Sequence, residues 1–260
     1  MSVQRTILYA TNGPVATITL HRPDVYNALN AQLHHELMAA LRQAERDPAV
    51  RCVVITGYGK AFCSGQDLRE FTDLGPDLDI GGRLRASYNP LVTFLRRMAK
   101  PVLAAVNGPA AGAGMSLALA CDLRVAAMSA RFSAAFVNIG LMPDCGMSYF
   151  LPRLIGQARA LELCLTGTTI DAETAHDWGL VNQVVADSDF PDLVQQFAEN
   201  LANRPALAIS LIKRALETSQ DSDLPHMLAY EAQAQDVAGA HPDFVEGVKA
   251  FREKRPPRWQ

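Results

Sequence analysis

A short segment rich in glycine and alanine constrains the fold more than any other part of this chain. Residues 100–106 read Lys-Pro-Val-Leu-Ala-Ala-Val, which is typical of a buried strand, and residues 110–116 read Ala-Ala-Gly-Ala-Gly-Met-Ser and open an apolar segment. The sequence therefore predicts a strand, a sharp turn and a helix. The first turn of a helix has unpaired N–H groups and a partial positive charge, so this corner can bind an anion or an oxygen that becomes one. It can equally be a close-packed helix start without a ligand.

A second corner of the same kind lies earlier in the chain. Residues 50–56 read Val-Arg-Cys-Val-Val-Ile-Thr, as a buried strand does, and small residues follow in Ala-Phe-Cys-Ser-Gly-Gln-Asp-Leu at 61–68. If each corner offers one backbone N–H, the two can hold a single oxygen between them. An enolate or a tetrahedral oxyanion requires such a pair of donors.

The remainder of the chain alternates strand-like and helix-like segments as far as residue 190 and is helical beyond it. Repeated strand–turn–helix units indicate an α/β protein built as stacked turns of a spiral. The shift in composition near 190 favours a division into a core, 1–190, and a helical C-terminal region, 191–260. Segment 67–80 is punctuated by Gly and Pro, which predicts an irregular loop. We expect strands at 15–20, 102–106 and 123–127, and helices at 33–44, 84–98, 145–155, 192–203, 206–218, 223–237 and 243–252.

The net charge and the cysteines indicate which partners and which cellular environment to expect for this chain. The formal net charge is −3 over 260 residues, which gives no electrostatic reason to expect nucleic acid or a membrane surface as a partner. The five cysteines show no C-x-x-C spacing and the six histidines no metal-ligand spacing. We therefore expect buried thiols in a reducing cytosol, no metal, and a soluble cytoplasmic protein without a signal peptide or membrane span.

A series of further motifs runs in a fixed order over nearly the whole chain. They are His-Arg-Pro-Asp-Val-Tyr-Asn-Ala-Leu at 21–29, the two corners above, Cys-Asp-Leu-Arg-Val-Ala at 121–126, Gly-Leu-Met-Pro-Asp-Cys-Gly at 140–146, Leu-Thr-Gly at 165–167, Ala-His-Asp-Trp-Gly-Leu-Val at 175–181 and Phe-Arg-Glu-Lys-Arg-Pro at 251–256. In these motifs and their order the chain resembles the enoyl-CoA hydratase/isomerase (crotonase) superfamily. Within it the chain is most similar to the phenylacetate-pathway epoxide isomerases, which share Tyr-Asn-Pro-Leu-Val at 88–92 and Pro-Asp-Cys-Gly at 143–146.

The resemblance implies a fold, a substrate class and an assembly. The fold is a crotonase-like spiral of strand–turn–helix units, and the C-terminal helices pack against neighbouring subunits to build homotrimers, often paired into hexamers. The substrate is an acyl-CoA thioester. No separate cofactor is implied, because CoA is part of the substrate.

The same resemblance assigns the oxyanion hole and makes one activity less favoured. It places the thioester carbonyl between the backbone N–H groups of Gln66 and Ala113. Hydratases of the superfamily carry two glutamates, and the matching positions here hold Ser116 and Phe136. Water addition needs a group that deprotonates water and a source of a proton for carbon. A hydroxyl and a phenyl ring do not supply that pair, so simple hydratase activity is disfavoured.

A carboxylate, Asp144, lies eight residues beyond Phe136, and the resemblance makes it the catalytic residue. A single carboxylate suffices for isomerisation, because the same group can remove a proton at one carbon and return it at another. The expected activity is therefore an isomerisation of an enoyl-CoA or an epoxyphenylacetyl-CoA type of thioester. On sequence alone Asp144 can equally be the N-cap of a helix over 145–155.

The resemblance also suggests residues around the substrate. Phe136 would form a wall of the acyl pocket and favour a large or aromatic acyl group, although an ordinary core position is the commoner role of such a residue. Arg22 and Lys254 are either CoA contacts, with Lys254 reaching CoA of its own chain or across a subunit interface, or solvated surface charges. The expected acyl pocket contains Phe136, Ser116, Tyr88 and Phe71, and the expected CoA contacts are Arg22, Ala28, Ala61, Ser64, Phe251 and Lys254.

Other functions stay open at this stage. An enoyl-CoA hydratase could handle water with Asp144 alone. A dehalogenase-like enzyme could use this aspartate as a nucleophile, although segment 83–98 lacks the helical histidine of such relatives. A non-catalytic acyl-CoA-binding protein belongs to another class. RNA binding is disfavoured, because the basic pairs of this mildly acidic chain are isolated.

Overall fold

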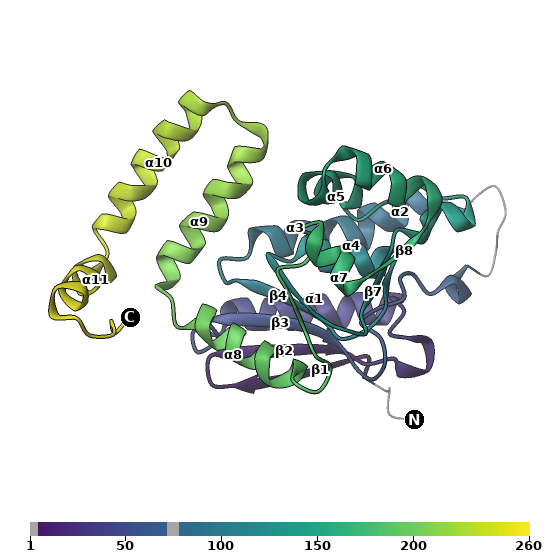
Figure 1. Cartoon of the computed structure of the whole chain (residues 1–260), viewed down its shortest axis with the longest axis horizontal. Coiled ribbons are helices and arrows are strands. Elements are labelled where there is room, and N and C mark those ends of the chain that lie inside the picture. The colour runs from purple at the N-terminus through teal and green to yellow at the C-terminus, as the bar shows by residue number, and fades with distance from the viewer. Residues whose placement is uncertain (1–4, 72–77) are drawn as a thin grey trace.

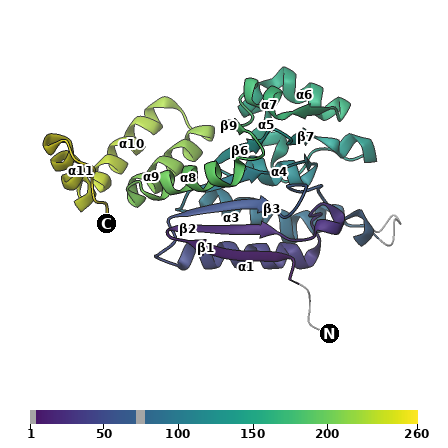
Figure 2. The same ribbon diagram turned by 60° about the horizontal axis from the view of Figure 1, so that its bottom comes forward.

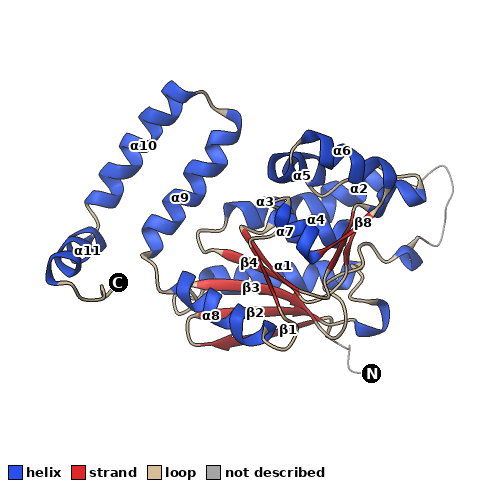
Figure 3. Cartoon of the chain, in the orientation of Figure 1, coloured by secondary structure: helices blue, strands red, loops and turns tan. Residues whose placement is uncertain are grey.

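The computed structural model describes residues 5–71 and 78–260, which form two sheets surrounded by helices (Figures 1 and 3). The large sheet has the order β1-β2-β3-β4-β6-β9, in which β1 and β2 are antiparallel and all other neighbours are parallel. In the small sheet, β7 pairs in parallel with β5 and antiparallel with β8. The strands are β1 (Ile7–Asn12), β2 (Val15–Leu20), β3 (Cys52–Gly57), β4 (Val102–Val106), β5 (Ala110–Ala111), β6 (Leu123–Ala127), β7 (Arg131–Ser133), β8 (Thr169–Asp171) and β9 (Gln183–Val185).

Most helices connect successive strands, as the alternation in the sequence predicts. Three-residue and five-residue helical turns, η1 to η5, lie at corners and helix ends. The helices are α1 (Ala31–Arg46), α2 (Ile80–Arg83), α3 (Asn89–Arg97), α4 (Ala113–Ala120), α5 (Met147–Ile155), α6 (Gln157–Thr166), α7 (Ala172–Asp177), α8 (Phe190–Ala202), α9 (Ala206–Thr218), α10 (Leu224–Gly239) and α11 (Pro242–Glu253). The turns are η1 (Pro23–Val25), η2 (Leu68–Glu70), η3 (Leu84–Tyr88), η4 (Ala135–Ile139) and η5 (Ser219–Asp221).

Both faces of the large sheet are buried, which explains the continuous apolar runs of its central strands. Along β3, Val53 and Ile55 join the core cluster under α1, α3 and α4. Cys52 and Val54 point to the other face and join a second cluster under α8. The α4 segment is buried along its whole length, as its Ala/Leu-rich sequence predicts.

The cysteines are free thiols, and four of the five are buried while Cys164 is half-buried. No helix among the described residues combines the length and apolar character that a membrane span requires.

The helix expected at 84–98 starts earlier and contains an irregular turn. Helix α2 continues directly into η3, a π-helical turn, and then into α3. The Asn89 N–H bonds the Leu84 carbonyl five residues back. Pro90 then falls in the first turn of α3, where its missing N–H costs no hydrogen bond. The irregular loop predicted at 67–80 contains η2 and the start of α2, while 72–77 lies outside the described residues.

The C-terminal helices divide into one that covers the sheet and three that extend from it. Helix α8 buries Phe190, Val194 and Ala198 against the large sheet. In both orientations α10 and α11 lie away from the two sheets (Figures 1 and 2). The part of the region 191–260 that projects from the core therefore begins with α9.

A cluster of charged side chains fixes the projecting helices to the core. The Lys213 ammonium group on α9 lies 2.6 Å from the Asp122 carboxylate and donates to the Lys100 carbonyl oxygen at 2.8 Å. On the next turn Glu217 pairs with Arg96 of α3 at 2.6 Å. Asp122 also accepts from the Val102 N–H, so the same carboxylate fixes the start of β4.

We expect Lys213→Met to lower the free energy of unfolding by about 2 kcal/mol. The Lys213 and Asp122 side chains are only 11% and 15% exposed, and removal of one partner of a well-buried pair costs about 3–5 kcal/mol, reduced here by the residual exposure. Urea titration measures the change. Lys249→Met on exposed α11 is the matched control and should change it by less than about 0.5 kcal/mol. Equal effects of the two substitutions would contradict this role for Lys213.

Candidate active site

The two glycine-containing corners meet beside each other. Cys63 forms an isolated bridge with Ala110, and the Ala111 N–H donates to the Cys63 carbonyl oxygen at 3.0 Å. On its other side the same segment pairs with the chain before α1, through a bridge between Leu29 and Gln66. The strand exit after β3 is therefore held between the start of α1 and the start of α4.

Two glycines allow this close approach. A Cβ on Gly114 would lie 2.2 Å from the Cys63 carbonyl oxygen, so no side chain fits there. Gly65 has φ +99°, and a Cβ on it would lie 2.9 Å from the Ala111 carbonyl oxygen and 3.4 Å from the Ala113 nitrogen. Any other residue at these positions would separate the two corners.

The approach leaves the N–H groups of Gln66 and Ala113 available. The Leu29 N–H donates to the Gly65 carbonyl and the Asp67 N–H donates to the Leu29 carbonyl, at 2.7 and 2.8 Å. Successive groups of an extended chain alternate in direction, so the Gln66 N–H faces away from Leu29. Ala113 is the first residue of α4, where no intrahelical acceptor exists. Within the described part of the chain neither amide donates a hydrogen bond, so both are available for the role of donors that the family resemblance implies.

A pocket of about 180 Å³ opens at these amides. Gly65, Gln66, Gly112 and Ala113 form one side, and Asp144 lines the same space. The remaining wall is largely apolar and comes from three segments that are distant in sequence. These contribute Leu68 and Phe71, then Ile80, Leu84 and Tyr88, then Phe136, Ile139 and Leu141.

Asp144 lies in the pocket and is not a helix cap. The N-cap of α5 is Gly146, with no side-chain hydrogen bond. Burial raises the pKa of the Asp144 carboxyl above that of an ordinary aspartate, and the Cys145 thiol opposes this rise by donating to Oδ1 at 2.9 Å. No described group donates to Oδ2. The carboxylate is therefore a base that is stronger than an exposed aspartate and has one oxygen free.

The raised pKa of Asp144 predicts that Asp144→Asn stabilises the fold at neutral pH. The folded state holds this proton more tightly than the unfolded state, so stability falls as pH rises from the ordinary aspartate pKa through the raised value, and the loss persists above it. The neutral amide avoids this loss. Thermal unfolding at pH 7 and below pH 4 measures the difference: the variant should melt higher at pH 7, and the gain should vanish at the acidic pH. A gain of equal size at both pH values would contradict the assignment.

The aromatic residues predicted for the acyl pocket line it, and the serine does not. Phe136 and Tyr88 are 6% and 7% exposed and contact the pocket with Phe71. Ser116 is fully buried, and its hydroxyl donates to the backbone carbonyl oxygen of Asp144 at 3.0 Å. The structure thus places Ser116 behind the wall, where it holds the turn that carries the carboxylate.

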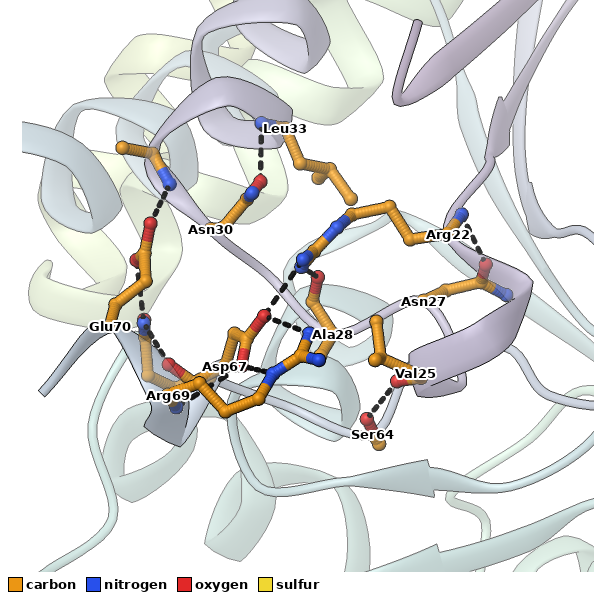
Figure 4. A network of polar contacts seen from close by, with 12 residues as sticks. Arg22, Val25, Asn27, Ala28, Asn30, Leu33, Ser64, Asp67, Arg69 and Glu70 are labelled. Atoms are coloured by element: carbon orange, nitrogen blue, oxygen red, sulfur yellow. Dashed lines mark hydrogen bonds and ion pairs between the residues drawn. The ribbon is translucent and has the colours of Figure 1, made fainter. Parts of the chain in front are cut away.

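Arg22, predicted to contact CoA, is engaged inside the protein. Its guanidinium donates to Asp67 at 2.8 Å and to the carbonyl oxygen of Ala28 (Figure 4). Asp67 also accepts from the backbone and side chain of Arg69 and caps η2. These contacts lower the pKa of Asp67 far below its usual range, with the Arg69 side chain as the largest cause. Asp67 and Arg22 thus fix the loop that bears Gln66.

The other predicted CoA contacts are dispersed. Ser64 is exposed and lines the pocket. Ala28 and Ala61 are buried, and the Ala61 carbonyl oxygen accepts from Asn27 at 2.8 Å. Phe251 and Lys254 are exposed at the end of α11, a helix that lies apart from the two sheets (Figure 1), and neither residue lines the pocket. Their contact with CoA stays a prediction that requires a second subunit.

Sequence reasoning missed the polar side chains around Gln66 and the apolar wall opposite Asp144. Tyr88 donates its hydroxyl proton to Gln66 Oε1, and Glu70 accepts from Gln66 Nε2 at 3.1 Å. Ile139 is the last residue of the short turn η4 and Leu141 follows it, and neither position has a helical or strand periodicity that would indicate a pocket wall. Within 5–71 and 78–260 no group of three His, Cys, Asp or Glu side chains is arranged to hold a metal ion.

Comparison with known proteins gives one family. A family model described as enoyl-CoA hydratase/isomerase matches residues 10–260. The 1,2-epoxyphenylacetyl-CoA isomerase of Escherichia coli (strain K12) is 45% identical over 247 residues, 94% of each chain. A probable enoyl-CoA hydratase of Rhodobacter capsulatus is 47% identical over 254 residues, which cover 98% of this chain and 97% of the relative.

Solved structures agree with this result. The crystal structure of a putative enoyl-CoA hydratase/isomerase from Mycobacterium abscessus superimposes with a TM-score of 0.90 at 40% identity, and covers 98% of this chain and 99% of the other. The match extends over the projecting helices as well as the core.

Proposed function

The chain belongs to the enoyl-CoA hydratase/isomerase family, and we propose that it isomerises an acyl-CoA thioester with Asp144 as the only acid/base. One observation carries the proposal: among the described residues, Asp144 is the one carboxylate that lines the pocket, and it shares this largely apolar space with the two unpaired backbone N–H groups of Gln66 and Ala113. Two amides that bind the thioester oxygen stabilise the enolate, and each such donor is worth about 3 kcal/mol in the transition state.

The proposed reaction needs only the carboxylate of Asp144 and the backbone amides of Gln66 and Ala113. With the carbonyl oxygen held by the Gln66 and Ala113 amides, Oδ2 of Asp144 removes a proton from the carbon next to the thioester. The electrons of that C–H bond move into the enolate, and the negative charge spreads onto the held oxygen. In a 3-enoyl thioester the double bond then shifts, and Asp144 returns the proton to the fourth carbon. Atoms and charge balance, and water is not consumed.

The acyl group is proposed to be compact or aromatic. Phe136 occupies the wall where hydratases of the family, by resemblance, carry a glutamate. Its ring offers an apolar surface against which another ring can pack. An epoxyphenylacetyl thioester, the substrate that the name of the Escherichia coli relative implies, meets this description. Its isomerisation would begin in the same way: Asp144 removes a proton from the carbon next to the thioester, and the two amides hold the enolate oxygen that forms.

We also propose a homo-oligomer assembled through the projecting helices. Ile212, Leu216, Leu228 and Phe251 are more than half exposed on α9 to α11 in the single chain, and such apolar surface is typical of an interface. Light scattering tests the trimer or hexamer expected here.

The first experiment is mass spectrometry of a 3-enoyl-CoA incubated with the protein in heavy water. A shifted double bond with deuterium on carbon and no added water supports the isomerase. Added water would instead support the second candidate, an enoyl-CoA hydratase in which the free oxygen of Asp144 orients the water. An unchanged 3-enoyl-CoA, together with an unchanged epoxyphenylacetyl-CoA, would leave an acyl-CoA-binding protein and contradict both enzymes.

A further inference from the structure

A second and larger cavity lies next to the pocket, and the two share a wall. The second cavity has a volume of about 670 Å³, against about 180 Å³ for the pocket. Gln66, Arg83 and Tyr88 line both of them. These three side chains, here called the partition, therefore separate the two spaces. Beyond the partition the cavity is bounded by α1, through Met38, and by the π-helical turn, through Ala86, and charged side chains such as Arg42 and Glu70 also line it.

A chain of hydrogen bonds holds the partition closed. The Tyr88 hydroxyl donates to Gln66 Oε1 from one side, and Gln66 Nε2 donates to Glu70 Oε2 at 3.1 Å on the other. Glu70 is held in turn by the Ala31 N–H at 3.0 Å, the first amide of α1 (Figure 4). Both polar ends of the Gln66 side chain are thus occupied, so the side chain stays between the two cavities.

The Tyr88 ring is held equally firmly. Tyr88 is the last residue of the π-helical turn η3, an irregularity that occurs frequently at functional sites. Its ring packs edge-to-face on His34, with ring centroids 4.0 Å apart. Burial lowers the pKa of His34 to about 4, so this imidazole is neutral at physiological pH, and the charges at the cavity come from Arg42, Glu70 and Arg83.

We propose that the partition sets the length of the acyl group, and that the second cavity receives the far end of longer acyl chains when the Tyr88–Gln66 contact opens. The pocket alone is smaller than the roughly 300–1,000 Å³ usual for ligand sites, so it holds a short or ring-shaped acyl group. The inference rests on the proposed function only in that the pocket binds an acyl-CoA. It does not depend on which reaction follows.

Calorimetric titration with saturated acyl-CoA thioesters tests the partition without turnover. Hexanoyl-CoA and dodecanoyl-CoA are titrated into the wild type, Gln66→Ala, Tyr88→Phe and the double variant Gln66→Ala/Ala86→Phe. A methylene that is fully buried tightens binding about fourfold, and a partly charged wall reduces this gain. The preference for dodecanoyl-CoA is the ratio of the dissociation constant of hexanoyl-CoA to that of dodecanoyl-CoA. Gln66→Ala should therefore raise this ratio at least about tenfold over the wild type. Tyr88→Phe keeps the ring and loses the hydroxyl, so its shift should be smaller and of the same sign.

Ala86→Phe fills the second cavity from its far side and is the internal control. In the double variant the preference for dodecanoyl-CoA should return toward the wild-type value, because the introduced phenyl ring would then occupy the cavity that the acyl chain enters. A preference within twofold of the wild type for Gln66→Ala overturns the proposal. So does a double variant that keeps the full gain, since the tail would then lie elsewhere. If neither the wild type nor the variants bound either thioester, the proposed function and this inference would both be wrong. If hexanoyl-CoA bound but no isomerase activity were found, only the proposed isomerase reaction would be wrong.

Discussion

Asp144→Asn lowers kcat of the isomerase by about 10³- to 10⁴-fold and leaves acyl-CoA affinity within about threefold of the wild type. The amide has nearly the shape of the carboxylate and can still accept from the Cys145 thiol, but it takes no proton from carbon. Acid–base groups contribute about 10²- to 10⁴-fold, and the upper part of this range applies because Asp144 both removes and returns the proton. Single-turnover rates, together with calorimetric dissociation constants, separate chemistry from binding.

Asp192→Asn is the matched control for this substitution. It makes the same chemical change at an exposed residue of α8, outside the lining of the pocket, so its turnover should equal that of the wild type. If Asp144→Asn kept more than a tenth of the wild-type rate, another group would be moving the proton. The same variant should be more stable than the wild type at pH 7, so lost activity cannot be attributed to unfolding.

The elements that the sequence predicts best are those with local causes. The strand at 102–106 and the helix at 206–218 have the predicted bounds. An unbroken apolar run indicates a buried strand and a helical repeat indicates a helix, and both patterns lie within the element itself. The edge strands β1 and β9 are not predicted. β9 has three residues and forms through its parallel pairing with β6, a long-range contact with no periodic signal.

The features of the candidate site also divide into those with a local sequence signal and those that depend on contacts between distant residues. The two corners are predictable, because closely spaced small residues mark where backbones can approach, whereas the choice of the two donor amides comes from the family resemblance. The contacts that hold the corners in place are not predictable, since they join residues distant in sequence. Arg22 pairs with Asp67 at 45 positions of separation, and Tyr88 bonds Gln66 at 22. The position of Ser116 behind the wall likewise follows from how the turn of Asp144 folds back on α4, which no local pattern records.

Gly65→Ala tests whether the close approach of the two corners is what creates the oxyanion hole. The new methyl group would lie 2.9 Å from the Ala111 carbonyl oxygen, which is a backbone atom that cannot rotate away. The corners must therefore separate and the Gln66 and Ala113 amides no longer converge on one oxygen. Loss of one such donor lowers kcat by about 10²- to 10³-fold, and we expect a decrease of this size in isomerisation.

Gly13→Ala separates this effect from backbone strain. Gly13 also has a positive φ, +54°, but its Cβ would meet no atom within 4 Å. Both substitutions place alanine in the left-handed region, at a cost of about 1–2 kcal/mol in stability, and only Gly65→Ala adds the collision. Stability should therefore fall in both variants, and activity per folded molecule should fall only in Gly65→Ala. If both variants retained full turnover, the thioester oxygen would not be held between these corners, and the carboxylate of Asp144 would be acting on a substrate bound in another way.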